Sequence, residues 1–221
     1  MRLRIAGLRP VSCSDGLPGE VCAVLWTQGC PLRCPWCHNP ETRDPNGGKK
    51  ADVKTILRDV EKYAVYLDAL IVSGGEPLLQ PYEELKALAR GARDLGLNVV
   101  LDTSGFPPDR LGRVISSFDR VALDLKAPLH GDEYIEATGG GMTASDFLKA
   151  ARIVRRRCDL ELRITVHPWL DDVPKVVEAV RKASPDVVVV QRYVGDKEVE
   201  IDPEELAEKL RESCENVVVR V

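Results

Sequence analysis

The sequence CAVLWTQGCPLRCPWCHNP, residues 22–40, contains the elements that decide which fold this chain adopts. Its first part, residues 22–27, is an apolar run that is long enough for a buried strand but too short for a helix. The run leads through Gly29 directly into three cysteines with the spacing C-x3-C-x2-C. A buried strand that ends in a loop of unusual side chains is typical of parallel α/β sheets, in which binding residues follow the carboxyl ends of the strands.

The rest of the chain alternates between strand-like and helix-like patterns. Apolar residues follow helical spacing from Asp52, which is placed to cap the first turn, as far as Leu67. The apolar strand ALIVSGGEP, residues 69–77, then breaks at two glycines, and the next helix opens at Pro81 and stops at Gly96. Further strands are expected at 98–105, 121–126, 160–166, 187–194 and 216–221, with helices around 111–115, 147–154 and 176–180 and from 203 to 214.

This alternation predicts an α/β protein, because parallel partner strands are joined only through crossover connections. With 221 residues, we expect an open, partial βα barrel of about six parallel strands. A closed eightfold barrel generally takes about 250 residues. We expect one domain, 1–221, with an irregular start before residue 22, a loop across 44–50, and a last strand, 216–221, whose position the sequence does not fix.

Composition narrows the class of protein. Hydrophobic residues make up 44% and charged residues 30%, which is ordinary for a globular chain. The net charge of -4 gives no reason to expect a nucleic-acid or membrane partner. Because the first residues lack a signal-peptide pattern and no span of about 20 apolar residues occurs, we expect a cytoplasmic protein. The seven cysteines are odd in number and three of them crowd into residues 30–37, so they suggest metal rather than disulfides.

Polar residues at the strand ends are expected to meet at one face of the barrel. The cysteine loop follows the first strand, 74–77 follows the second, 102–105 follows the third, and 124–126 ends the fourth. Loops that leave the carboxyl ends of parallel strands converge, so these four segments should face one cavity. Weaker candidates for the same rim are Arg163, Thr165, His167, Gln191 and Arg192.

The cysteine spacing indicates an iron–sulfur cluster. Three thiolates in one short loop can hold a compact cluster, and a four-iron cluster held by three cysteines leaves one iron open for a substrate. The alternative is a zinc-stabilised binding module without enzymatic activity, in which His38, Cys22 or Cys13 supplies the fourth ligand. The chain lacks the second paired knuckle that usually builds such a zinc site, which favours the cluster.

The segments TQGCPLRCPWCHNP and SGGEPLLQ together resemble the radical S-adenosylmethionine (SAM) superfamily. The resemblance implies that Cys30, Cys34 and Cys37 bind a [4Fe-4S] cluster whose open iron chelates SAM. It further implies that reduction cleaves SAM to methionine and a 5'-deoxyadenosyl radical. In this arrangement the cofactor carries the difficult radical step, and the protein positions and shields it.

The same resemblance implies further contacts to the cofactor. Gly74, Gly75 and Glu76 would contact the methionine amino group, because glycines allow the backbone to approach a ligand closely. Trp36 would border the adenine. The structural alternatives are a tight turn for GGEP and a buried core aromatic for the tryptophan.

Within the superfamily, LDTSGF and VALDLKAP are similar to the D-T-N-G-F and D-x-K elements of glycyl radical enzyme activases, with Ser104 in place of the usual asparagine. The likeness implies that Asp102, Thr103 and Asp124 form a monovalent cation site beside the cofactor carboxylate, with Lys126 as a neighbouring charge. A cation or Lys126 would be needed there, because clustered acids repel a carboxylate. The alternatives are a helix cap for Asp102 and a surface acid for Asp124.

The opening S-x2-D-G-L-P-G, residues 12–19, and the short length resemble the compact anaerobic ribonucleotide reductase activating proteins. This implies a glycyl radical enzyme as protein substrate and a flavodoxin or ferredoxin-type electron donor. A pyruvate formate-lyase-type activase, or a radical SAM enzyme acting on a small molecule, RNA or peptide, remains as an alternative. Arg163 and His167 are candidate cofactor contacts, although a lone histidine before Pro168 is also typical of a structural role.

Overall fold

Strands and helices alternate through the computed structural model, which describes residues 2–168, 170, 172–195 and 199–220. The strands are β1 (Arg2–Ser12), β2 (Cys22–Thr27), β3 (Lys49–Asp52), β4 (Ala69–Gly74), β5 (Asn98–Thr103), β6 (Arg120–Leu125), β7 (Asp159–Val166), β8 (Val187–Arg192) and β9 (Val217–Arg220). The α-helices are α1 (Val53–Glu61), α2 (Tyr82–Asp94), α3 (Pro108–Val114), α4 (Glu133–Ala137), α5 (Ala144–Arg155), α6 (Val173–Ala183) and α7 (Pro203–Leu210). Short 3-10 turns occupy Pro40–Arg43, Ala64–Tyr66, Pro77–Leu79 and Ile115–Ser117.

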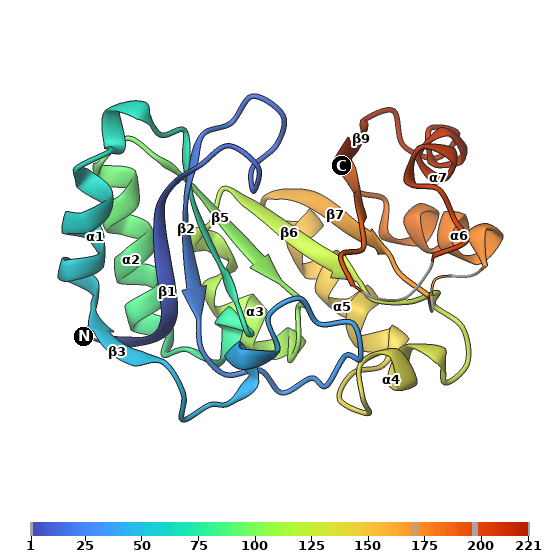
Figure 1. Ribbon diagram of the computed structural model, residues 1–221, viewed down its shortest axis with the longest axis horizontal. Coiled ribbons are helices and arrows are strands. Elements are labelled where there is room, and N and C mark those ends of the chain that lie inside the picture. The colour runs from blue at the N-terminus through green and yellow to red at the C-terminus, as the bar shows by residue number, and fades with distance from the viewer. Residues whose placement is uncertain (1, 169, 171, 196–198, 221) are drawn as a thin grey trace.

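All nine described strands form one sheet in the order β3-β1-β2-β4-β5-β6-β7-β8-β9 (Figure 1). Each pair from β2 to β9 is parallel, whereas β1 pairs antiparallel with both β2 and β3. The sheet begins at β3 and ends at β9 without the two edges pairing, so the predicted open, partial βα barrel is confirmed. The parallel part has seven strands rather than about six, because the last strand pairs with β8.

The two faces of the strands have different partners. Leu70 and Val72 of β4 belong to the main core, which also contains the buried residues of the helices. Ala69 and Ile71, which alternate with them, belong to a small cluster on the other face of the sheet. Because side chains alternate across a strand, the next residue on that inner face is Ser73, which lines a cavity. The inner face therefore changes from apolar to polar toward the carboxyl ends of the strands.

The amino-terminal region differs from the prediction. It forms the long strand β1 rather than an irregular start, and β3 occupies the end of the predicted loop and continues to Asp52. The two strands pair with each other, Arg4 opposite Lys50 and Ile5 opposite Lys49. The pairing of β1 with β2 contains register shifts near Gly7 and between Arg9 and Ser12, which interrupt the alternating pattern by which a strand is recognised.

The first helix is shorter than the apolar spacing predicts. As expected, the Asp52 side chain accepts a hydrogen bond from the Lys54 backbone N–H and caps α1. The helix ends at Glu61, however, and a 3-10 turn follows in which Tyr66 is exposed. The chain then leads into β4, and just before this strand the Asp68 backbone N–H donates to the Val21 carbonyl. Among the described residues, no helix is both long and apolar enough to cross a membrane.

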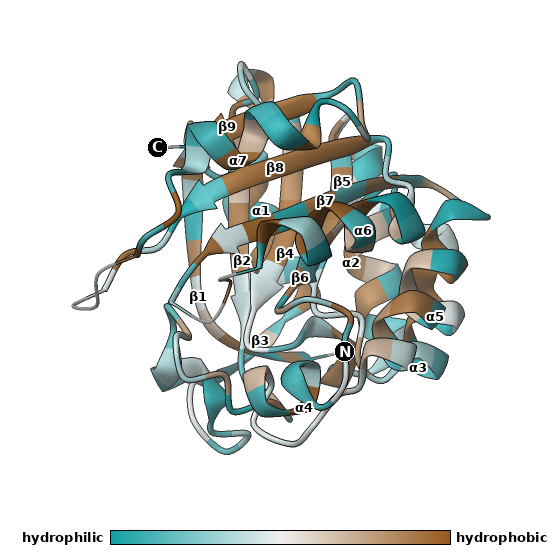
Figure 2. Ribbon diagram, turned by 90° about the vertical axis from the view of Figure 1, so that its right-hand side faces the viewer, coloured by the Kyte–Doolittle hydropathy of each residue, from teal (hydrophilic) through white to brown (hydrophobic). Residues whose placement is uncertain are grey.

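The helices form a layer that follows the order of the strands. Successive helices α1, α2, α3, α5, α6 and α7 contact one another in turn. Figure 2 shows apolar residues along the strands and polar residues along the outer sides of these helices. Each helix therefore covers the apolar outer face of the sheet and leaves the strand ends free to form a site.

Candidate functional site

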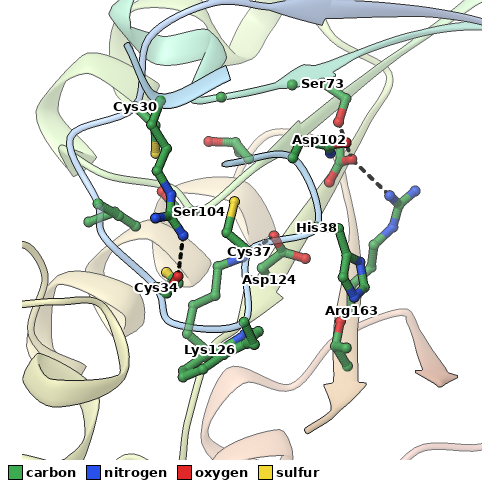
Figure 3. Close-up of a pocket in the computed structure, with 18 of the residues that line it drawn as sticks. Cys30, Cys34, Cys37, His38, Ser73, Asp102, Ser104, Asp124, Lys126 and Arg163 are labelled. Carbon is green, nitrogen blue, oxygen red and sulfur yellow. Dashed lines mark hydrogen bonds and ion pairs between the residues drawn. The ribbon is translucent and has the colours of Figure 1, made fainter. Parts of the chain in front are cut away.

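The carboxyl ends of the parallel strands open into one cavity, which we call the central cavity (Figure 3). Its lining comes from the loop after β2 and from the ends of β4 to β8. The lining residues are Cys30, Leu32, Cys34, Trp36, Cys37, His38, Asn39, Arg43, Ser73, Gly74, Gly75, Asp102, Thr103, Ser104, Asp124, Lys126, Arg163, Thr165 and Gln191. The structure thus brings together all four segments that the strand order predicted to converge.

Backbone hydrogen bonds hold the cysteine loop in place. The N–H of Cys30 donates to the Arg43 carbonyl at 3.2 Å, and the N–H of Cys37 donates to the Cys34 carbonyl at 3.2 Å. The Arg43 guanidinium also donates to the Cys34 carbonyl, and the N–H of Arg33 donates to the Thr138 carbonyl at 3.0 Å. One contact within the loop and the others from Arg43 and Thr138 thus fix the segment that carries the three thiols.

The thiols of the cysteine loop are buried or half-buried. Burial raises the pKa of Cys30 to about 11 and also raises the pKa of Cys34. Metal binding at neutral pH therefore has to displace protons from these thiols. Within the described part of the chain, no three His, Cys, Asp or Glu side chains are grouped as ligands of one ion. Cys22, a suggested zinc ligand, lies at the opposite end of β2 from the loop and pairs with Ala69.

The two glycines of GGEP are needed for chain packing. Gly74 has φ +110°, and a Cβ there would overlap the backbone of Thr27. A Cβ on Gly75 would overlap the carbonyl of Gly29. The N–H of Gly75 donates to the Thr27 carbonyl at 2.9 Å. The glycines thus allow two backbone segments to touch, and both residues also line the central cavity.

Glu76, for which a contact with the methionine amino group was predicted, has its side chain hydrogen-bonded to groups of the protein. Its carboxylate is fully buried and is not part of the cavity lining. It accepts hydrogen bonds from the Thr103 hydroxyl, from the Ser104 hydroxyl and N–H, and from the Leu78 N–H. Burial raises the pKa of Glu76, and this effect outweighs the hydrogen bonds, which lower the pKa. The carboxylate therefore connects the turn after β4 to the end of β5 and the turn that follows it by hydrogen bonds. It stabilises the site without lining the cavity.

Two carboxylates face the cavity, and each has a cationic partner (Figure 3). Asp102 lies 2.9 Å from Arg163 Nη1 and accepts a hydrogen bond of 2.6 Å from the Ser73 hydroxyl. Asp124 lies 2.6 Å from Lys126 Nζ. Burial alone would lower the pKa of Lys126, but Asp124 and other anionic groups outweigh burial and raise it. The helix-cap reading of Asp102 is wrong, because α3 begins only at Pro108 and its cap position is Pro107.

A buried ion-pair network that the sequence did not reveal lies behind Arg163. Glu161 is fully buried, and its carboxylate lies 2.7 Å from Arg163 Nε and 3.0 Å from Arg120 Nε. Arg120 in turn pairs with Glu20 at 2.6 Å. In LELRITV, Glu161 and Arg163 alternate with apolar residues, so both lie on the same face of the strand. This alternation could have predicted that Glu161 lies beside Arg163.

His167 also lies behind the cavity wall rather than in it. Its ring stacks on Trp36 with centroids 3.7 Å apart, and its Nε2 lies 3.0 Å from the Lys126 carbonyl. Burial lowers the pKa of His167 to about 4, so the ring is neutral at pH 7 and Nε2–H donates to that carbonyl. In this position the ring supports Trp36, which does line the cavity, and a contact of His167 with the cofactor stays a prediction.

The rim contains residues that were weak candidates or were missed. Thr165 and Gln191 do line the cavity, and the Gln191 amide donates to the Thr165 hydroxyl at 2.7 Å. Arg192 is exposed and does not line the cavity. Ser73 and Arg43 were missed, although Ser73 directly precedes the two glycines at the end of an apolar strand.

A partial βα barrel with three loop cysteines, a GGEP turn and a polar wall at its strand ends defines the class of protein. The chain belongs to the radical SAM superfamily, whose family model matches residues 24–179. It is a radical SAM enzyme of the glycyl radical activase type. The residues of the cavity fit the [4Fe-4S] cluster and SAM that this superfamily uses.

Two curated relatives and one solved structure illustrate the similarity. The pyruvate formate-lyase-activating enzyme of Clostridium pasteurianum is 35% identical over 76% of this chain and 71% of its own length. The pyruvate formate-lyase 1-activating enzyme of Escherichia coli K12 is 30% identical over 76% of this chain and 70% of its own. The crystal structure of QueE from Escherichia coli shares the fold, with a TM-score of 0.62, 15% identity, and coverage of 99% of this chain and 93% of that one.

Proposed function

We propose that this protein generates a glycyl radical on a partner enzyme. When bound in the central cavity, the [4Fe-4S] cluster and SAM would supply the chemistry of a 5'-deoxyadenosyl radical, which can take a hydrogen atom from a glycine of the partner. The observation that carries the proposal is that Cys30, Cys34 and Cys37 face the same cavity as the DTS and DLK segments. The names of the relatives, which activate pyruvate formate-lyase, support the same type of reaction.

The chain's own residues bind and orient the cofactor in this proposal. The three cysteines hold the cluster, and Gly74 and Gly75 present backbone groups to the cavity. The positive charges of Lys126 and Arg163 offset the two carboxylates, so an anionic ligand group can be bound beside them. A monovalent cation held by Asp102, Thr103 and Asp124 would add to this effect, and activity should then depend on whether sodium or potassium is present.

The partner that we propose is an anaerobic ribonucleotide reductase. The opening S-x2-D-G-L-P-G, residues 12–19, supports this choice. We propose that residues 1–221 act as one domain in this reaction. A pyruvate formate-lyase-type partner is the alternative, since the relatives carry that name. We further propose that the reaction takes place in the cytoplasm, with an electron from a flavodoxin or a ferredoxin-type protein.

The test is electron paramagnetic resonance of a mixture of reconstituted protein, SAM, dithionite and a candidate glycyl radical enzyme encoded beside it. We expect a glycine-centred doublet and one 5'-deoxyadenosine for each radical. Formation of 5'-deoxyadenosine that responds to a small molecule, RNA or peptide, without any doublet, would assign a different radical SAM reaction. A colourless protein that binds zinc and contains no sulfide would exclude both the activase function and any other radical SAM reaction.

A further inference from the structure

A second groove is lined by residues of β1, of β3 and of the segment that leads to Cys30. Figure 1 shows β1 and β3 at one edge of the sheet. We call this second groove the outer groove. Its lining residues are Arg2, Arg4, Gln28, Gly29, Pro45, Lys50, Leu79, Gln80 and Pro81. None of these residues lines the central cavity, so the two spaces are separate.

Only one layer of backbone separates the outer groove from the central cavity. Gly29 lines the groove, and the next residue, Cys30, lines the cavity. The Gly29 carbonyl accepts a hydrogen bond of 2.8 Å from the Glu76 N–H, and a Cβ on Gly75 would overlap that carbonyl. Gly75 itself lines the cavity. A protein seated in the groove would therefore lie directly against the loop that holds the thiols.

The groove is basic although the whole chain is acidic. Arg2, Arg4 and Lys50 line it, and among the described residues none that line it is acidic. The chain as a whole has a net charge of -4, so this local charge is not an average property. Arg4 is held in place by hydrogen bonds from its guanidinium to the carbonyls of Asn46 and Gly47 at 2.8 and 2.9 Å.

Apolar residues also line the groove. Pro45, Leu79 and Pro81 lie among the basic residues, and Leu79 is 38% exposed, which is unusual for a leucine in this protein. Protein interfaces commonly combine apolar contact residues with polar and charged residues. Small interfaces of this kind, steered by complementary charge, are typical of transient electron-transfer complexes.

We propose that the outer groove docks a small acidic one-electron carrier protein, which reduces the cluster bound by the three cysteines. The carrier loses one electron, the bound cluster gains it, and no bond forms or breaks in this step. The inference rests on the proposed function, because an electron is needed only if the cluster drives cleavage of SAM. Lysines on an edge strand also prevent unwanted strand pairing, so the test has to separate these two roles.

The chain offers a matched control within a single strand. Lys50 is opposite Arg4, and both line the outer groove. Its neighbour Lys49 is also exposed but is opposite Ile5, and both of those line a different groove. Lys50→Glu and Lys49→Glu therefore make the same change in net charge on the same edge strand, and only the first alters the outer groove.

The experiment measures binding of oxidised flavodoxin and, separately, oxidised ferredoxin to the reconstituted protein by titration calorimetry at low and high salt. We expect Lys50→Glu to weaken binding of an acidic carrier at least about tenfold at low salt, and Arg2→Glu combined with Lys50→Glu to weaken it further. Lys49→Glu should bind the carrier about as tightly as the unmodified protein does. SAM cleavage driven by dithionite should be the same in all variants, because a small reductant does not need the groove.

Equal effects of Lys49→Glu and Lys50→Glu, or no effect of either, would overturn the assignment. Weakened binding of the glycyl radical enzyme with unchanged carrier binding would assign the groove to that partner instead. Failure of the proposed function would give a different result. The unmodified protein would then not cleave SAM even with dithionite, whether or not the carrier binds to the groove.

Discussion

At the scale of single residues, the thiols of the cysteine loop determine whether the protein carries a cluster. Cys34→Ala should abolish iron–sulfide absorbance and 5'-deoxyadenosine formation, because a thiolate ligand is lost. The fold should remain, since the loop lies outside the strands of the sheet. Far-ultraviolet circular dichroism and iron content measure the two effects.

The matched control for that variant is Cys158→Ala. Cys158 is partly buried just before β7 and does not line the central cavity. The control should keep both the cluster and the activity. Unfolding of Cys34→Ala alone would show that the loop has a structural role.

His167 makes stability depend on pH. Its pKa is about 4 in the folded protein, against 6.5 for an ordinary histidine. Between these values the unfolded chain binds a proton that the native protein does not bind, so native stability is fully present above about pH 6.5 and falls as the pH drops toward 4. A difference of one pKa unit corresponds to about 1.4 kcal/mol. The free energy of unfolding should therefore be about 3 kcal/mol lower near pH 4 than at pH 7 because of this buried side chain.

Urea denaturation at pH 7 and pH 4.5 tests this dependence. His167→Gln keeps a donor for the Lys126 carbonyl but does not titrate, so its stability should fall less over the same pH interval. The comparison uses two proteins prepared identically without the cluster. Equal losses in the two proteins would show that other groups cause the acid sensitivity.

At the scale of elements, the contact between the GGEP turn and the cysteine loop depends on a missing side chain. Gly75→Ala would place a Cβ against the backbone carbonyl of Gly29, which cannot move without shifting Cys30. We expect a loss of stability of about 1–3 kcal/mol and a lower iron content after reconstitution.

Gly112→Ala is the control for this prediction. Gly112 lies in α3, and a Cβ there meets no atom within 4 Å. The control should be neutral or stabilised by up to about 1 kcal/mol, because alanine favours helices. Denaturant titration and iron analysis compare the two variants, and equal behaviour would contradict the tight packing described for Gly75.

At the scale of the whole molecule, the buried ion-pair network joins the cavity wall to the amino-terminal loop. Glu161→Ala would remove the carboxylate that Arg120 and Arg163 share, while Arg120 keeps Glu20 and Arg163 keeps Asp102. Breaking a buried pair costs about 3–5 kcal/mol when a charge is left uncompensated, so we expect a loss of about 3 kcal/mol here. The pair of Arg93 and Asp119, which is more than a third exposed on both sides, is the comparison. Asp119→Ala removes this pair and a hydrogen bond from the Val99 N–H, so it should cost about 1–2 kcal/mol.

Chemical denaturation measures both variants of this comparison. Glu161→Gln tests whether charge or shape matters, because it keeps the volume and removes the negative charge. A similar small effect of Glu161→Ala and Asp119→Ala would show that the network adds little to stability.

The sequence by itself determined the alternation of strands and helices, the open barrel, and the convergence of the cysteine loop with the GGEP, DTS and DLK segments. These features follow from local patterns together with one topological fact, namely that loops after parallel strands share one face. Cys30, Cys34, Cys37, Lys126 and Arg163 could therefore be placed at one site from their positions along the chain.

Only the tertiary structure decided features that depend on pairs of residues far apart in the chain. The pairing of β1 with β3, the contact of Glu76 with the turn after β5, and the stacking of His167 on Trp36 are of this kind. Local spacing shows which face of a strand a residue occupies, but it does not show which distant side chain meets it there. That choice is made by strand register and side-chain packing, which exist only in the folded chain.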